Sequence, residues 1–276
     1  MASEQQADSV RVAVLGAGNI GSAVALGWLR SGYAAPRELL LVRRNLGELD
    51  ARLGECAQST DLAEAARRAR WLLVALPVAQ VEPALRALRP LLGADHVVLC
   101  CAARVDEAQL RAWAGPAPRL VRVMPNVAAA VCESMTCISG ADAAALAVAR
   151  ELFAPLGRVE CVAEALLNSA TVLCACGLAF MLRAVRGAAQ GGVEIGFHAD
   201  QASRLAAQTA RGAASLLLDP RYGVAHAEQG IDQVTTPQGC TIVGLNQLEH
   251  GGFSSALIKA VLASKRRIDG MLDKGT

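Results

Sequence analysis

The sequence has few aromatic residues, no excess of charge of either sign and no long apolar run. Only 3% of its 276 residues are aromatic, and 27 basic against 25 acidic residues leave a net charge of +2. Such a balance lacks the basic surface that nucleic-acid binding requires. No uninterrupted apolar segment reaches the roughly 20 residues needed to cross a bilayer, and the polar start MASEQQADS differs from a signal peptide. We therefore expect a cytoplasmic protein with neither nucleic acid nor membrane as a partner.

Metal-binding patterns are missing as well. The nine cysteines form no CxxC pair with zinc spacing, and the four histidines lie far apart. The total number of cysteines is odd, and most of them lie inside apolar runs. Both observations favour reduced thiols that act as small core residues. Cys174 and Cys176 are one residue apart on a predicted helix, where two side chains do not face each other. We therefore expect no metal site, and we favour packing over redox chemistry for these two thiols.

What the sequence does contain is apolar material in two different patterns. Hydrophobic residues make up 53% of the chain, which is enough for a sizeable core in one large domain or two ordinary ones. In the first part, runs typical of buried parallel strands alternate with helix-like segments, and this predicts an α/β fold with a doubly wound, Rossmann-type parallel sheet. The runs are 10–15, 39–42, 71–76, 96–101 and 120–123.

From about residue 164 the pattern predicts helices only. They are expected at 165–190, 200–218, 236–250 and 254–272, with breaks at Gly191-Gly192, Asp219-Pro220 and Gly251-Gly252. The change of periodicity predicts two domains, an α/β domain over 1–164 and an all-helical domain over 165–276.

The clearest chemical motif follows the first predicted strand, where the chain reads GAGNIG from Gly16 to Gly21 and then enters a helix. In a dinucleotide-binding βαβ unit, Gly16 makes the tight turn, Gly18 lets the backbone approach a pyrophosphate, and Gly21 lets the helix pack close to the strand. Asn19 and Ile20 complete the loop. The alternative is a merely structural glycine-rich turn.

The end of the second strand indicates which dinucleotide binds. NAD-binding units usually carry an acidic residue about 20 positions after the glycines, to hold the ribose hydroxyls. This chain has Arg43, Arg44 and Asn45 there, and arginine can hold phosphate oxygens in a bidentate fork. The pattern favours NADPH over NADH, unless both arginines are simply solvated surface charges.

A second candidate site lies at the start of the segment TTPQGCTIVGLNQLEHGGF, Thr235 to Phe253. Thr236 suits a helix N-cap and Pro237 the first helical position. The backbone N–H groups of Gln238, Gly239 and Cys240 would then lack intrahelical partners, beside the positive end of the helix dipole. Such a helix start can bind an anion, although most are only capped and solvated.

Three motifs together resemble the pyrroline-5-carboxylate reductase family over nearly the whole chain: GAGNIGSA, RVMPN at Arg122 to Asn126, and TTPQGCTIVGLNQLEHGGF. The resemblance implies an N-terminal Rossmann domain and a C-terminal helical domain that interlocks with a partner subunit, giving a homodimer or a higher oligomer. It also implies NADPH-dependent reduction of a small cyclic imino acid. By this resemblance Met124, Pro125 and Asn126 face the nicotinamide, and Leu76 and Pro77 also belong to the cofactor-binding residues.

The same resemblance places the substrate carboxylate at Gln238, Gly239 and Cys240. It assigns Thr241 the catalytic hydrogen bond near the ring nitrogen, and it puts Cys176 in a segment that approaches the substrate. The protein would mainly position the two reactants and exclude water, with no side chain acting as a nucleophile.

The chain departs from the family pattern around the presumed substrate pocket. Cys174 to Phe180 read CACGLAF where the family has SGSGPAY, Arg104 follows two alanines where the family has glycine, and Gln238 replaces a glycine of TPGG. Pyrroline-5-carboxylate remains the leading substrate. The alternatives are another cyclic imine in a secondary pathway, or a catalytically silent protein that binds dinucleotide or imino acid.

Overall fold

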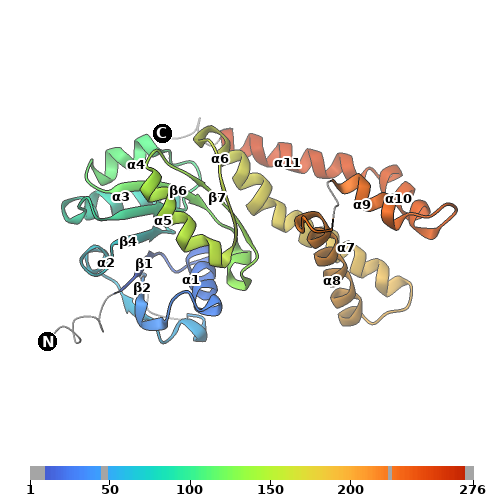
Figure 1. The fold of residues 1–276 in the computed structure, drawn as a ribbon, viewed down its shortest axis with the longest axis horizontal. Helices are drawn as coiled ribbons and strands as arrows, with labels where there is room; N and C mark the ends of the chain where they lie inside the picture. The colour runs from blue at the N-terminus through green and yellow to red at the C-terminus, as the bar shows by residue number, and fades with distance from the viewer. Residues whose placement is uncertain (1–9, 45–48, 223–225, 271–276) are drawn as a thin grey trace. The chain divides into compact units, whose positions relative to one another are not determined.

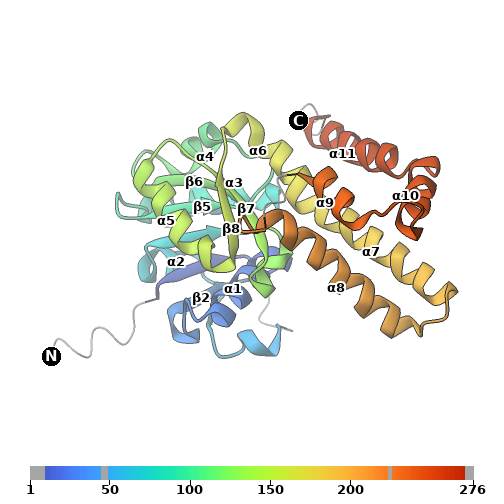
Figure 2. The same ribbon diagram turned by 45° about the vertical axis from the view of Figure 1, so that its right-hand side comes forward.

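The computed structural model describes residues 10–44, 49–222 and 226–270, and the chain divides into two compact units (Figure 1, Figure 2). Among the described residues, the first unit comprises 10–44, 49–175 and 267–270. The second unit runs from Cys176 to Arg266. The division falls inside one continuous helix, Glu164–Glu194.

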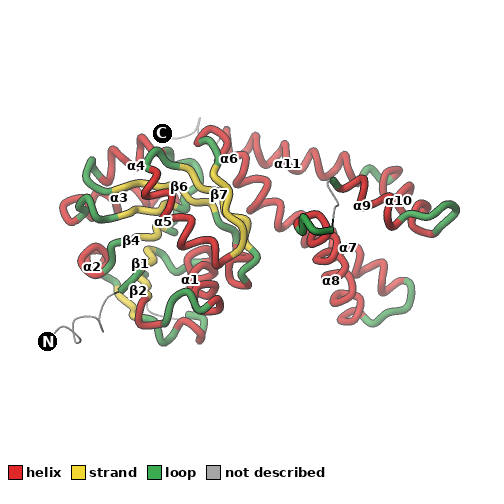
Figure 3. Tube along the Cα trace, viewed as in Figure 1, coloured by secondary structure: helices red, strands yellow, loops and turns green. Residues whose placement is uncertain are grey.

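The first unit is built on an eight-stranded sheet with the order β3-β2-β1-β4-β5-β6-β7-β8. All neighbouring strands are parallel except β6 and β7, which pair antiparallel. Figure 3 shows these strands in yellow among the red helices of this unit. The strands are β1 Val12–Leu15, β2 Leu39–Val42, β3 Ala57–Ser59, β4 Trp71–Val74, β5 Val97–Cys100, β6 Arg119–Met124, β7 Ser134–Ser139 and β8 Gly157–Cys161.

Successive residues of each strand point to opposite faces of the sheet, so one strand contributes to two cores. Val12 and Val14 pack with α1 (Asn19–Ser31) and α5 (Ala143–Phe153), whereas Ala13 and Leu15 pack with α2 (Leu62–Arg68), α3 (Val78–Leu88) and α4 (Glu107–Ala114). Both faces of β1, β2 and β4 are therefore covered, which explains why these strands read as continuous apolar runs.

The predicted α/β class is confirmed, and each of the five predicted strands lies within two residues of its expected bounds. Three strands were not predicted. β3 is only three residues long, β8 is a largely exposed edge strand, and β7, which pairs antiparallel with β6, mixes polar and apolar residues. None of the three has the apolar run by which a buried parallel strand is recognised.

Within the described residues 164–222 and 226–270, every regular element is a helix, as predicted. The helices are α6 Glu164–Thr171, α7 Gly177–Glu194, α8 Ala199–Leu218, α9 Ala227–Val234, α10 Cys240–His250 and α11 Phe253–Gly270, with a π-helical turn Val172–Cys176 between α6 and α7. The predicted break at Gly191-Gly192 is wrong. The helix continues to Glu194 because these glycines keep helical backbone angles, and the turn comes instead at Gly196, whose φ is 110°. Helix α9 was not predicted.

Candidate active site

The glycine loop lies at the carboxyl edge of the sheet, between β1 and α1. Gly16 has a φ of 96°, and a Cβ there would lie 2.7 Å from the Ala75 carbonyl oxygen. A Cβ on Gly21 would overlap the Gly16 carbonyl oxygen, whereas a Cβ on Gly18 would meet no atom within 4 Å. Gly16 and Gly21 are thus required by the protein's own packing. Gly18 has open space beside it, which is where a pyrophosphate would approach.

Helix α1 begins as a helix that binds phosphate should. Its N-cap is Gly18, which provides no side-chain cap, and its first turn contains no acidic residue. The first backbone N–H groups of a helix have no intrahelical partners and carry the positive end of the helix dipole. This end of α1 can therefore hold an anion.

A cavity with a volume of about 470 Å³ adjoins this loop. It brings together most of the predicted cofactor residues from three separate loops: Gly16, Gly18, Asn19, Ile20, Arg43, Arg44, Leu76 and Pro77. The structure therefore places both arginines on the same cavity as the glycine loop. Asn45, the third residue predicted here, lies outside the described residues.

A second cavity of about 300 Å³ shares Arg43, Arg44, Leu76 and Gln80 with the first, and Leu62, Pro83 and Ala84 add apolar groups to its lining. Thr60 and Gln80 add polar groups to it. None of these last five residues was predicted. Thr60 directly follows the unrecognised strand β3, and Gln80 lies in the first turn of α3 after Pro77, so locating the carboxyl ends of β3 and β4 would have indicated both.

The exit of β6 lies at the same edge of the sheet but is built differently. Met124 and Asn126 are 5% and 6% exposed, and Pro125 is buried too. The Asn126 Nδ2 donates to the Cys174 carbonyl oxygen at 3.0 Å, and its Oδ1 accepts from the Ala128 N–H at 3.0 Å. The Asn126 amide thus fixes the protein's own backbone, and contact of this stretch with the cofactor remains a prediction.

Cys174 lies in the π-helical turn, and its thiol faces that of Cys137 on β7. Its Sγ is 4.0 Å from that of Cys137 on β7, in a small core with Met124 and Leu167. Burial, reinforced by the neighbouring Cys174, raises the pKa of the Cys137 thiol to about 12. Both thiols therefore stay neutral at physiological pH. Cys176 is half-buried in the same turn.

Helix α10 begins later in the chain than the sequence predicts. The helix begins at Cys240 with Gly239 as N-cap, so the predicted capping role of Thr236 and helical position of Pro237 are wrong. Gln238 adopts a left-handed φ of 58°, and the Gly239 N–H donates to the Thr236 carbonyl oxygen at 3.0 Å. Residues 236–239 therefore form a turn, because a left-handed residue cannot continue a right-handed helix.

This shift moves the amides that are open to an anion. The Gly239 N–H is already bonded, so the first-turn N–H groups of α10 are those of Cys240, Thr241 and Ile242. The turn contains no acidic residue, and the N-cap supplies no side-chain bond. Gln238 and Cys240 are exposed beside it.

Thr241 lines a cavity of about 380 Å³ within the second unit, together with Thr209, Leu216 and Leu245. Among the described residues the Thr241 hydroxyl has no hydrogen-bond partner, whereas the Thr209 Oγ1 donates to the Leu205 carbonyl oxygen at 2.9 Å. Of these two hydroxyls, Thr241 is therefore the one that is open to a ligand.

Comparison with known proteins assigns both halves of the chain. Residues 164–271 match the family model described as pyrroline-5-carboxylate reductase dimerisation, and residues 11–104 match the model described as NADP oxidoreductase coenzyme F420-dependent. Among solved structures, the chain is similar to a pyrroline carboxylate reductase from Plasmodium falciparum, with a TM-score of 0.84 and 20% identity over 96% of this chain and 99% of that one. A pyrroline-5-carboxylate reductase from Coxiella burnetii gives a TM-score of 0.81 and 24% identity over 95% and 98% of the two chains.

Sequence relatives are closer. The chain is 41% identical to pyrroline-5-carboxylate reductase 1 of Dictyostelium discoideum over 92% of its own length, although it spans only 48% of that relative. It is 38% identical to reductase 2 of the same organism over 93% of this chain and 91% of the relative. The pea enzyme is 31% identical over 94% and 95%. On this identity and coverage, the chain belongs to the pyrroline-5-carboxylate reductase family.

Proposed function

We propose that the protein catalyses the NADPH-dependent reduction of pyrroline-5-carboxylate to proline. The observation that carries this proposal is the 38% identity to a pyrroline-5-carboxylate reductase over 91% of that relative's length. It is supported by the single cavity that combines the glycine loop with Arg43 and Arg44. A relative of similar fold is named as having NADP bound.

The cofactor residues fit NADPH. The N-terminus of α1 and the open space at Gly18 suit the pyrophosphate, and Arg43 with Arg44 suits the 2′-phosphate. The apolar second cavity beside the arginines suits the adenine. When bound, NADPH supplies the hydride that reduces the imine carbon.

The substrate side of the proposal rests on α10. The N–H groups of Cys240, Thr241 and Ile242 would hold the carboxylate, beside Gln238 and Gly239, and the free Thr241 hydroxyl would fix the nitrogen end of the ring. A protonated imine needs no nucleophile from the protein. The protein's contribution is therefore to orient the two reactants and exclude water. Cys176 is proposed to line the approach to the substrate.

A second candidate, reduction of another cyclic imine, is favoured by one observation. Arg104 and Gln238 both adopt left-handed φ values, 68° and 58°, which glycine adopts far more readily. Both stand where the family pattern has glycine, so this chain carries a side chain at each of these two positions of the presumed pocket loops. A pocket altered in this way would suit a substrate of different size or charge.

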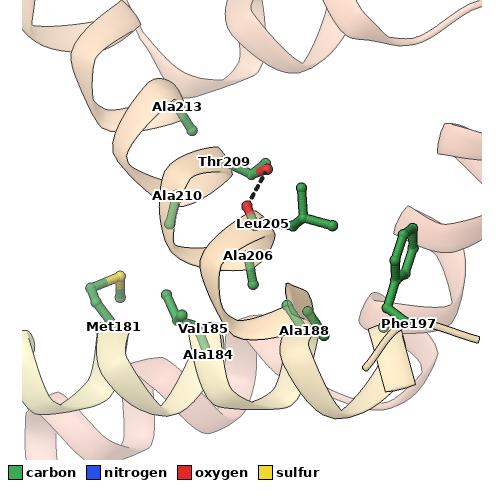
Figure 4. Close-up of a pocket in the computed structure, with 12 residues that line it drawn as sticks. Met181, Ala184, Val185, Ala188, Phe197, Leu205, Ala206, Thr209, Ala210 and Ala213 are labelled. Carbon is green, nitrogen blue, oxygen red and sulfur yellow. Dashed lines mark hydrogen bonds between the residues drawn. The ribbon is translucent and has the colours of Figure 1, made fainter. Parts of the chain in front are cut away.

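We also propose that the protein is at least a homodimer. The apolar cavity between α7 and α8, about 420 Å³ in volume, is lined almost entirely by small and aliphatic side chains such as Val185, Leu205 and Ala206 (Figure 4). The helix Glu164–Glu194 is 31 residues long and apolar enough to cross a membrane, with only 11% of its most apolar window buried. It lies within the segment that matches the dimerisation model, so a second subunit would cover it. We further propose a cytoplasmic location, which the nine free cysteines support because reduced thiols are typical of a reducing compartment.

The test is to follow NADPH absorbance with the purified protein and a panel of cyclic imines, with and without a carboxylate. Rapid oxidation with pyrroline-5-carboxylate supports the proposed function. Activity only with another imine supports the second candidate. Binding of NADPH without turnover of any imine would support the alternative of a catalytically silent protein that binds the dinucleotide. Light scattering that gave a stable monomer at micromolar concentration would contradict the dimer.

A further inference from the structure

Arg122 is a buried cation in the middle of the sheet. It lies on β6 directly opposite Cys100 of β5, and it is only 4% exposed. Its positive charge lowers the pKa of the Cys100 thiol against the larger effect of burial, which raises it to about 11. Arg122 therefore pairs with the last residue of β5, where the β5–α4 loop (Cys101–Asp106) begins.

The contacts of this guanidinium within the described part of the chain are few. Its NH1 lies 3.5 Å from the Glu164 Oε1, and its Nε and NH2 are buried without a hydrogen-bond partner. A buried charge with one long contact is costly, because the loss of hydration is only partly compensated. Overall stability is thus a poor explanation for an arginine at this position.

Glu164 connects Arg122 to two other elements. It is the first residue of α6, and its Oε1 also accepts the backbone N–H of Glu107 at 2.7 Å. Glu107 is the first residue of α4, so it ends the β5–α4 loop. The other end of this loop is held by the Cys101 N–H, which donates to the Val74 carbonyl oxygen at 2.9 Å. The loop is therefore held at both ends, and one of the two anchors depends on the carboxylate that Arg122 contacts.

The loop lies where the cofactor is expected. It leaves β5 at the same sheet edge as Ala75, Leu76 and Pro77, which leave the neighbouring strand β4 and line the glycine-loop cavity. In open α/β sheets, ligands bind outside the carboxyl ends of the strands. We propose that Arg122 is a positioning residue that acts through Glu164 to hold the β5–α4 loop in the arrangement that hydride transfer requires. This inference rests on the proposed function.

The variants Arg122→Met, Glu164→Gln and their combination test the inference. Methionine is long and apolar, and Glu164 is 43% exposed, so removal of Arg122 leaves no buried carboxylate and the fold should persist. Arg119→Met is the matched control, because Arg119 lies on the same strand but is 45% exposed, with Asp142 at 3.6 Å. Circular dichroism would verify that all four variants fold.

The rate of amide hydrogen exchange reports on the order of the β5–α4 loop and does not require enzymatic activity. Arg122→Met should speed exchange in the 101–107 segment by about tenfold, and Arg119→Met should not. With pyrroline-5-carboxylate, kcat should fall by about tenfold while the Kd of NADPH stays within about threefold, because misplacement affects the reacting geometry more than the adenosine contacts. The double variant should lose no more than the worse single variant, as expected for residues acting through one contact.

Unchanged exchange and unchanged kcat in Arg122→Met would overturn the inference. If the losses in kcat of the two single variants multiplied in the double variant, Arg122 would not act through Glu164. If the wild-type protein reduces no imine, the proposed function fails, and the exchange measurement still decides whether Arg122 holds the loop.

Discussion

The side-chain amide of Asn126 links the end of β6 to the π-helical turn at Cys174. Its Nδ2 donates to the Cys174 carbonyl oxygen and its Oδ1 accepts from the Ala128 N–H, both at 3.0 Å, and the side chain is almost completely buried. π-Helical turns leave carbonyl groups without their usual i+4 donors, so an outside donor is needed. Asn126 supplies that donor.

Replacement of Asn126 by alanine should therefore destabilise the protein by about 1–3 kcal/mol, since it leaves two partly buried backbone groups without partners. Urea unfolding followed by circular dichroism measures the change. The control is Asp95→Ala, which removes only an exposed ion pair with Arg70 and should shift the free energy of unfolding by less than about 0.5 kcal/mol. Equal effects of the two substitutions would contradict the role assigned to Asn126.

The glycine loop yields a prediction from two neighbouring positions. Gly21→Ala should impair both stability and NADPH binding, because its Cβ would overlap the Gly16 carbonyl oxygen. Gly18→Ala should fold normally, because a Cβ there meets no protein atom within 4 Å, but it should weaken NADPH binding by at least about tenfold by obstructing the pyrophosphate. Thermal unfolding and calorimetric titration separate the two effects. Normal NADPH affinity in a correctly folded Gly18→Ala variant would contradict the assignment of the pyrophosphate to this loop.

Arg43 and Arg44 should determine the preference for NADPH. Charge-assisted contacts to a 2′-phosphate should make NADPH bind at least about tenfold more tightly than NADH, which corresponds to about 1.4 kcal/mol. The double change Arg43→Ala, Arg44→Ala should remove this preference and leave the affinity for NADH nearly unchanged. Equal affinities of the wild-type protein for the two dinucleotides would exclude the assignment.

The sequence predicts the first unit well where burial on both faces produces a strong pattern. The strand Leu39–Val42 has the predicted bounds, and the residues of the glycine loop, Arg43 and Leu76 meet on one cavity because the carboxyl ends of parallel strands share one edge. Residues that depend on unpredicted elements were missed. Thr60 follows the weakly patterned strand β3, and the roles of Arg122 and Glu164 arise from a contact between positions 42 residues apart.

Local capping rules failed at α10 for an identifiable reason. Thr236-Pro237 has the residues of a helix start, but Gln238 takes a left-handed conformation that a helix cannot contain. Glutamine gives no sequence signal for positive φ, whereas glycine would have. The three-residue error in the N-cap therefore follows from the same substitution that distinguishes this chain from its family pattern.

The buried thiol of Cys137 predicts a dependence of stability on pH. In the folded protein its pKa is raised from 9.0 to about 12, so between these values the unfolded chain binds fewer protons than the folded one. Stability should be fully present below about pH 9 and fall as the pH rises toward 12. Cys137→Ala should lose part of this slope when urea unfolding is compared at pH 8 and pH 10.5. An identical slope in the variant would show that Cys137 contributes nothing to it.

Thr241 and Thr209 provide the sharpest test of the substrate site. Both hydroxyls line the same cavity, but that of Thr209 is bonded to the Leu205 carbonyl oxygen of its own helix, whereas that of Thr241 has no partner among the described residues. Valine keeps the shape of threonine and removes only the hydroxyl. Thr241→Val should therefore lower kcat by about ten- to a hundredfold with pyrroline-5-carboxylate, if its hydrogen bond strengthens in the transition state. Thr209→Val should change kcat by less than about twofold, because its hydroxyl serves only its own helix. Steady-state kinetics at saturating NADPH measures both variants, and equal losses in the two would mean that the cavity, rather than the Thr241 hydroxyl, determines turnover.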